Sequence, residues 1–106
     1  MSAWTVYLVR CRDGSLYVGI TNDLPKRVRA HNAGRGGRYT RSRRPVALAF
    51  KRRCASSTNA RRWERALKQL DRARKLLLVA GDRSVLRAAR ARVTGWEEEA
   101  RETDRE

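Results

Sequence analysis

Two tyrosines in the N-terminal segment VYLVRCRDGSLYVGIT, residues 6–21, have a type and spacing that could serve chemistry. Tyr7 and Tyr17 each lie in a short apolar run, where Val or Ile would pack equally well. A free phenol has a pKa of about 10, and nearby cations can lower this pKa enough for the oxygen to act as a base near neutral pH. The pair either faces a ligand or consists of two ordinary strand aromatics covered by a helix.

Three more residues could complete such a site. Arg27 and His31 are four positions apart, so they project together from one side of a helix. His31 is the only histidine, and it either satisfies a hydrogen bond in the core or, beside Arg27, faces a phosphate. Glu64 is the only glutamate before residue 97, and its sequence neighbours are cationic. Its carboxylate either offsets their charge or ligates Mg²⁺, which needs only one or two carboxylates besides water and substrate phosphate.

Positive charge dominates the chain and is concentrated in one part of it. There are 26 Lys and Arg residues against 11 Asp and Glu, a formal net charge of +15, and residues 23–53 hold eleven basic residues and one acidic residue. Such a block favours a polyanion, most often nucleic acid, over a merely solvated basic surface. The last eleven residues, WEEEARETDRE, contain six acidic and two basic residues. We interpret residues 97–106 as a solvated acidic tail; the alternative is a weak nucleic-acid mimic that folds over the basic cleft.

Other classes of protein are disfavoured by what the sequence lacks. No apolar run approaches the ~20 residues of a membrane span, and the N-terminus has no secretory-signal pattern. Cys11 and Cys54 are far apart and form neither a CxxC pair nor a disulfide framework. A reduced, cytoplasmic protein that does not associate with membranes is the expectation.

The elements that must position the candidate residues follow from local patterns. Runs rich in β-branched and aromatic residues predict strands, and apolar residues at helical spacing predict helices. The expected order is strand 3–11, strand 15–21, helix 24–33, a mobile basic loop 34–45, strand 45–53, a helix from about 56 to 80, and a helix 83–95. This order predicts an α/β fold with a small three-stranded, mostly antiparallel sheet flanked by helices, with additional C-terminal helices and a frayed tail.

The register of the first hairpin decides which face each tyrosine occupies. A two-residue loop, Asp13-Gly14, would place Tyr7 and Tyr17 on opposite faces. A three-residue loop ending in a left-handed glycine would place them on one face, with Tyr7 opposite Gly19. We favour the longer loop because it separates apolar from hydroxyl-bearing side chains, and we expect Gly19 to leave a gap beside Tyr7 for a ligand.

The ordered set of these residues resembles the GIY-YIG nuclease domain, most closely the small stand-alone bacterial members of that family. The matching residues are the triplets Thr5-Val6-Tyr7 and Tyr17-Val18-Gly19, followed by Thr21, Arg27, His31 and Glu64. A threonine replaces the first glycine of the name motif, and valines replace its isoleucines. By this resemblance, residues 3–78 form the nuclease domain and residues 79–106 a helical extension with the acidic tail. Gly19 and Thr21 would be structural in the site.

The resemblance implies a metal-dependent endonuclease that hydrolyses phosphodiester bonds of DNA, with a structure-selective role in repair or recombination. Tyr7 and Tyr17 would activate and position the attacking water. Arg27 would bind the scissile phosphate, and His31 would hydrogen-bond within the site. Glu64 would hold a single Mg²⁺ or Mn²⁺ ion. A non-catalytic module that binds DNA or RNA through the same basic cleft is the alternative.

Several cations are expected to bind the nucleic acid outside the reacting centre: Lys26, Arg35, Arg38, Arg41, Arg43, Arg44 and Lys68. DNA is favoured over RNA, although an RNA or ribosome partner would suit the same arginine-rich block. Family nucleases with a defined target usually take their specificity from an extra domain or a partner protein. We therefore expect that a protein partner supplies specificity here.

Overall fold

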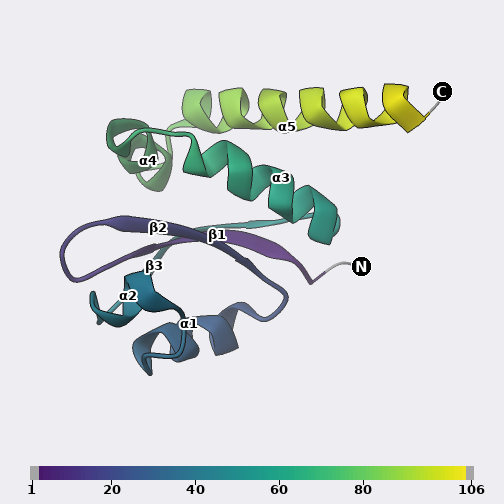
Figure 1. Ribbon diagram of the computed structural model, residues 1–106. Helices are drawn as coiled ribbons and strands as arrows, with labels where there is room; N and C mark the ends of the chain where they lie inside the picture. Colours follow the sequence, from purple (N-terminus) through teal and green to yellow (C-terminus); the bar gives the residue numbers. More distant parts are fainter. Residues whose placement is uncertain (1–2, 105–106) are drawn as a thin grey trace.

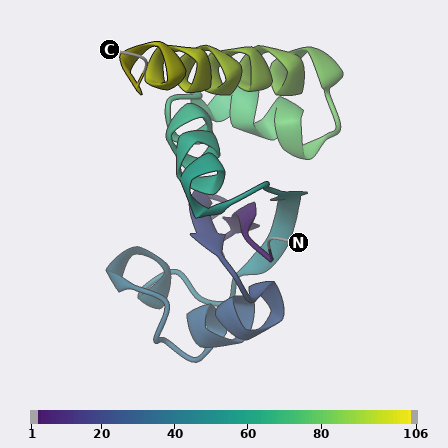
Figure 2. The same ribbon diagram turned by 90° about the vertical axis from the view of Figure 1, so that its right-hand side faces the viewer.

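A three-stranded sheet lies between two sets of helices in the computed structural model, which describes residues 3–104 (Figure 1). The elements in chain order are β1 (Thr5–Arg10), β2 (Leu16–Thr21), α1 (Leu24–Asn32), α2 (Arg38–Arg41), β3 (Ala47–Arg53), α3 (Ser57–Lys68), α4 (Arg72–Val79) and α5 (Arg83–Asp104). Helices α1 and α2 lie on one side of the sheet, and α3, α4 and α5 lie on the other (Figures 1 and 2). This confirms the predicted α/β fold class. No helix within residues 3–104 has the length and apolar character needed to cross a membrane.

The sheet has the order β2-β1-β3, and both outer strands are antiparallel to the central one. Each observed strand lies inside the range predicted for it. The pairing with β3 shifts between two neighbouring residues of β1, since Leu8 is opposite Phe50 whereas Val9 is opposite Leu48. Such an irregularity increases the local twist of the sheet.

The turn between β1 and β2 has the three-residue form. The Cys11 amide donates to the Ser15 carbonyl at 2.9 Å, which closes the loop Arg12-Asp13-Gly14. The glycine of this loop has φ = +85°, a conformation that glycine adopts without steric cost. Tyr7 is consequently opposite Gly19. The predicted register is confirmed, and the two-residue alternative is wrong.

The sheet has a large core on one face and a small one on the other. Towards α3, five strand residues alternate into the main core: Val6, Leu8, Leu16, Val18 and Ile20. Trp63 and Leu67 of α3 pack against them and are 3% and 0% exposed. On the opposite face, Tyr7 and Val9 pack with Val46 in a second cluster. Because neighbouring strand residues point to opposite faces, the phenols lie on the side of α1 and α2.

Helix α1 begins directly after β2 because the connection caps it. The Thr21 hydroxyl accepts a hydrogen bond from the Asp23 amide at 3.1 Å. The Asp23 carboxylate in turn accepts from the Lys26 amide at 3.2 Å, and Pro25 lies in the first turn. The helix ends before Gly34, which has φ = +82°. The predicted helix 24–33 is therefore confirmed to within one residue.

The segment predicted as one helix from about 56 to 80 is two helices, α3 and α4. Ser56 caps α3, since its hydroxyl accepts from the Asn59 amide at 3.0 Å. The first helix ends at Lys68, and Asp71 caps the next one by accepting from the Arg74 amide at 2.9 Å. A side chain that caps a new helix competes with continuation of the previous one, which explains the break.

The last helix does not end near Gly95 as predicted, but continues to residue 104. Trp96 packs against the main core, and the guanidinium of Arg65 lies 4.3 Å from the centroid of its ring. These contacts stabilise the helix beyond Gly95. The helical part of the acidic tail, residues 97–104, lies in the layer far from α1 and α2 (Figures 1 and 2). The mimic hypothesis is therefore wrong for these residues, while residues 105–106 lie outside the described part.

Candidate active site

A buried chain of three hydrogen-bonded side chains joins β1, α1 and α2. Tyr7 Oη lies 2.9 Å from His31 Nε2, and His31 Nδ1 lies 2.8 Å from Thr40 Oγ1. Tyr7, His31 and Thr40 are 0%, 0% and 1% exposed. The structure thus brings together two of the residues singled out in the sequence, and it adds Thr40 to them.

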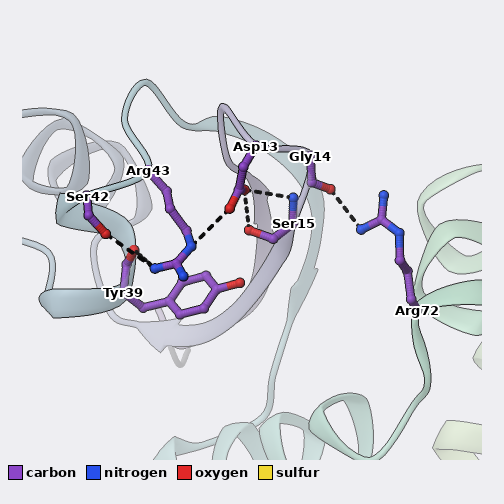
Figure 3. Close-up of polar contacts among 7 residues, drawn as sticks. All are labelled: Asp13, Gly14, Ser15, Tyr39, Ser42, Arg43 and Arg72. Carbon is purple, nitrogen blue, oxygen red and sulfur yellow. Dashed lines mark hydrogen bonds and ion pairs between the residues drawn. The ribbon is translucent and has the colours of Figure 1, made fainter.

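Tyr17 lies beside this chain, where it is only partly buried. Its ring meets His31 edge-on, with 5.6 Å between the ring centroids, and Tyr39 stacks on it at 5.8 Å. The guanidinium of Arg43 lies 3.9 Å from the Tyr39 centroid and donates to Asp13 at 3.0 Å (Figure 3). A stack of three side chains therefore forms the outer wall of the site.

The β1–β2 turn is held from both helical layers (Figure 3). Arg43 reaches Asp13 from the segment after α2, and Arg72 of α4 donates to the Gly14 carbonyl at 2.9 Å. Hydrogen bonds from Ser15, together with the interaction with Arg43, hold the pKa of the Asp13 carboxyl below its usual value. These contacts fix the ends of the two strands that carry the tyrosines.

Arg27 is half-buried next to the tyrosine–histidine pair. Its Nη2 donates to the Gly36 carbonyl at 3.0 Å, which connects α1 to the segment before α2. This contact uses one of the five N–H donors of the guanidinium. The charge of Arg27 acts on both Tyr7 and His31, so the predicted grouping of these three residues is present.

Burial determines the protonation of Tyr7 and His31 in the free protein. Burial raises the pKa of Tyr7 above its usual value, and the hydrogen bond and charge of Arg27 oppose this only in part. Burial, and after it the charge of Arg27, lower the pKa of His31 below its usual value of 6.5. Both side chains are therefore neutral near pH 7. In the free protein Arg27 does not bring the pKa of Tyr7 below its usual value, because desolvation outweighs the effect of the guanidinium.

Two glycines make room for the buried chain. A Cβ atom on Gly19 would lie 2.5 Å from Tyr7 Oη and 2.6 Å from its Cζ, and a Cβ atom on Gly36 would overlap His31 Nδ1. The ring of Tyr7 itself fills the space beside Gly19. The expected gap for a ligand is thus absent in this conformation of the described residues, and Gly19 serves the packing of the tyrosine.

Glu64 lies on α3, a helix of the opposite layer. Its side chain is 26% exposed, and its carboxylate pairs with Lys68 at 3.5 Å. Nowhere in residues 3–104 do three or more His, Cys, Asp or Glu side chains gather as a metal cage. A single accessible carboxylate nevertheless fits Mg²⁺, which keeps several waters and takes other ligands from substrate phosphate.

Most of the cations predicted to bind nucleic acid lie on α1 and α2 or in the segments next to these helices: Lys26, Arg35, Arg38, Arg41, Arg43 and Arg44. Of these six, only Arg43 forms an ion pair with an acidic side chain in the described part of the chain. Arg41 and Arg44 line a hollow of about 500 Å³ together with Arg12. Lys68 lies apart from them, beside Glu64.

Three residues of the site region escaped the sequence analysis. Tyr39 and Thr40 belong to the segment predicted as a mobile loop, which instead contains α2. An aromatic and a β-branched residue in an otherwise basic, glycine-rich stretch were the available signal that the segment packs inward. Asn32 joins the end of α1 to the start of β3, because its side chain accepts from the Val46 amide at 2.7 Å and donates to the Val46 carbonyl at 3.1 Å.

The helix-flanked antiparallel sheet with a paired tyrosine site defines the class of protein. A sequence profile of the GIY-YIG catalytic domain matches residues 3–76. The chain belongs to the GIY-YIG family, as the resemblance of its motifs predicted. Membership implies a nuclease domain that binds nucleic acid, and nucleases of this family generally use divalent metal ions.

Within this family the chain is similar to small proteins called UPF0213. It is 49% identical over 78 residues to UPF0213 protein DP2720 of Desulfotalea psychrophila, covering 73% of this chain and 71% of the relative. It is 44% identical over 78 residues to UPF0213 protein YazA of Bacillus subtilis, covering 74% and 79%. The solution NMR structure of UPF0213 protein BH0048 from Bacillus halodurans is 40% identical, with a TM-score of 0.48 over 73% of this chain and 82% of that one. The predicted domain boundary at residue 78 and the roles of individual site residues stay predictions.

Proposed function

We propose that the chain is a metal-dependent endonuclease that hydrolyses phosphodiester bonds of DNA. The observation that carries the proposal is the 2.9 Å hydrogen bond between Tyr7 and His31, with Tyr17 and Arg27 directly beside it. A histidine whose only role was to make a hydrogen bond in the core would need neither a second phenol nor a guanidinium beside it. The surrounding cations of α1 and α2 supply the attraction for a phosphate backbone.

Phosphate binding falls to Arg27 in this proposal. A guanidinium presents paired donors that suit a phosphate, and near a reacting phosphorus it stabilises the charge that develops on the oxygens. The hydrogen bond to Gly36 holds the half-buried Arg27 beside the tyrosine–histidine chain. The exposed arginines of α2 would then hold the flanking backbone.

The two tyrosines receive different tasks because their burial differs. Tyr17 is only partly buried, so we assign its hydroxyl to the attacking water. Tyr7 is fully buried and hydrogen-bonded to His31. As the water oxygen bonds to phosphorus, its proton would pass through the hydroxyl pair to neutral His31 Nε2, which lies 2.9 Å from Tyr7 Oη and becomes an imidazolium. The bond from phosphorus to the leaving oxygen breaks, and that oxygen takes a proton from solvent.

Glu64 would hold the single ion, Mg²⁺ or Mn²⁺. When bound, such an ion neutralises charge on the phosphate oxygens. The Glu64–Lys68 pair is a partly exposed i,i+4 contact at 3.5 Å, and such pairs near the surface contribute about 1 kcal/mol or less. Glu64 can therefore exchange Lys68 for an ion without a large loss of stability.

A cleavage assay tests the proposal. The substrates are single-stranded, duplex, flap and branched DNA, together with RNA, each with Mg²⁺ or Mn²⁺. Tyr17→Phe and Glu64→Gln should each reduce cleavage by about 10²-fold or more. Glu98→Gln, at an exposed glutamate of α5, is the matched control and should cut like the wild type. A preference for flaps or branches would support structure-selective action in repair or recombination, and cleavage that needs an added protein would indicate a specificity partner.

A non-catalytic module that binds DNA or RNA is the second candidate. The complete burial of Tyr7 in this conformation favours it, because a buried phenol does not reach a substrate. Tight binding without cleavage of any substrate would support this function. Affinities for DNA and RNA must be compared at matched salt, since phosphate contacts weaken both as salt rises.

A further inference from the structure

Three arginines line the hollow of about 500 Å³ at the turn end of the β1–β2 hairpin. Arg12 belongs to the turn, whereas Arg41 ends α2 and Arg44 lies in the segment that follows this helix. The other lining residues are Asn32, Ser42 and Pro45. We call this feature the arginine hollow. Its lining includes no acidic side chain from the described part of the chain.

The three positive charges of the arginine hollow have no carboxylate partner within residues 3–104. Asp13 follows Arg12 in the sequence, but it does not line the hollow. Its carboxylate accepts from Arg43 at 3.0 Å and from Ser15 at 2.6 Å. Like charges that share a concave surface repel one another and attract anions from solution. The hollow therefore suits a ligand with negative charge, which would remove this repulsion.

Arg44 is held in position before any ligand binds. Its Nε donates to the Arg41 carbonyl at 2.9 Å. Its guanidinium lies against Gly34, where an added Cβ atom would lie 2.9 Å from Nη1. Among the described residues, neither Nη1 nor Nη2 of Arg44 has a hydrogen-bond acceptor. The free side of this guanidinium thus presents donors in a fixed fork.

A phosphate group is the anion that fits these donors best. The fork of a guanidinium matches two oxygens of a phosphate or of a carboxylate. A phosphate group offers more oxygens than a carboxylate, so it suits a site with three guanidiniums better. The family of this chain binds nucleic acid, which supplies such groups.

The arginine hollow adjoins the outer wall of the candidate active site through Arg43. The Arg12 amide donates to the Arg43 carbonyl at 2.9 Å, which joins the turn to the segment after α2. The Arg43 side chain points to Tyr39 (Figure 3), and Tyr39 stacks on Tyr17. A strand with a phosphate group in the hollow would therefore lie close to this wall.

We propose that the arginine hollow is a second phosphate-binding site, which holds a phosphate group of the nucleic acid outside the reacting centre, with Arg44 as its main donor. The group is either an internal diester or a terminal monoester, since both present phosphate oxygens to the guanidiniums. Phosphate binding does not depend on the proposed cleavage, whereas any effect of the hollow on cleavage rests on the proposed function.

Titration of the full chain with inorganic phosphate, at constant ionic strength, tests the site directly by NMR. In the wild type, saturable shifts should appear at the amide signals of Arg12, Arg41 and Arg44. Arg44→Gln should raise the Kd for phosphate by about 10-fold, the loss of one charge-assisted hydrogen bond. Arg44→Lys should also raise this Kd, because an ammonium keeps the charge but lacks the planar fork.

Arg87→Gln is the matched control, since it removes the same charge from an exposed position of α5, on the other side of the sheet (Figure 1). Its Kd for phosphate should equal that of the wild type. The same Kd in Arg87→Gln and Arg44→Gln would show that only net charge attracts phosphate, and would overturn the proposal. A wild-type Kd in Arg44→Lys would overturn it too. So would a wild type without shifts at the hollow, a result that depends on no variant.

Short DNA strands with and without a 5′-phosphate or a 3′-phosphate identify the source of the phosphate group. Arg44→Gln should weaken the binding of all strands if the hollow holds an internal diester, and only that of one phosphorylated strand if it holds a terminal monoester. For the affected strand, the slope of log K against log salt concentration should become shallower by about one, the loss of one phosphate contact. Unchanged affinity for every strand would refute the role of the hollow in nucleic-acid binding.

Cleavage kinetics separate this site from the proposed function. In a chain that cuts DNA, Arg44→Gln should raise KM by about 10-fold with a smaller effect on kcat, because the lost contact binds substrate and transition state alike. A wild type that binds phosphate at the hollow but cuts nothing would refute the proposed function and leave the second phosphate site standing.

Discussion

Replacing Gly19 by alanine should disrupt the site by a steric route alone. The new Cβ would lie 2.5 Å from Tyr7 Oη, 2.6 Å from Cζ and 3.1 Å from Cε1. Gly19 does not have a positive φ, so alanine meets no backbone strain there. The ring of Tyr7 must therefore move, although it is fully buried and hydrogen-bonded to His31.

The expected loss of stability has two contributions, overpacking by the new Cβ atom and loss of the Tyr7–His31 hydrogen bond. Overpacking a core costs about 1–3 kcal/mol, and losing a hydrogen bond costs about 1 kcal/mol. Gly19→Ala should lower the free energy of unfolding by about 2–4 kcal/mol, which lowers Tm by about 10–20 °C. Any remaining cleavage should fall by about 10²-fold, because Tyr7 moves relative to the substrate.

Denaturant and thermal unfolding measure the effect, with Gly95→Ala as the control. A Cβ atom on Gly95 meets nothing within 4 Å, so that change should raise stability by up to about 1 kcal/mol, the gain of alanine over glycine inside a helix. Gly19→Ala should cost much less in a Tyr7→Val background, where the ring is gone. An equal loss of stability with and without the ring, or no loss at all, would refute the reasoning.

Three further perturbations probe other parts of the molecule. As the pH falls from about 7 to about 5, the free energy of unfolding should fall, because the pKa of His31 is lowered in the folded chain and only the unfolded chain then binds a proton. Urea unfolding at a series of pH values measures this, and in His31→Gln the free energy of unfolding should change less over the same pH range. Ser56→Ala should lower the free energy of unfolding by about 1 kcal/mol through loss of the α3 cap, and an unchanged urea midpoint would contradict that role. Arg43→Gln should change the free energy of unfolding by under about 1 kcal/mol, because Arg43 and Asp13 are partly exposed. The same variant should increase acrylamide quenching of Tyr39 fluorescence, since the Arg43 guanidinium lies over the Tyr39 ring. Unchanged quenching would show that Arg43 does not cover that ring.

Local features of the chain were predictable because they depend on neighbouring residues. The hairpin register followed from a glycine that accepts a left-handed turn and from the alternation of side chains along a strand. The start of α1 followed from Asp23 and Pro25. The end of α5 was predicted wrongly near Gly95, because the helix continues past this glycine when Trp96 packs against the core and α3, which are distant in sequence.

The sequence by itself determined the three strands, the first helix and the common face of Tyr7 and Tyr17, because turn chemistry and strand periodicity act over a few residues. Its motifs also identified the family. Only the tertiary structure decided that Tyr7 is buried, that its ring occupies the space beside Gly19, and that Thr40 completes the chain through His31. These facts depend on contacts between α2 and residues that are distant from it in the sequence. The burial that results, rather than the local cations, determines the protonation of Tyr7 and His31 in the free protein.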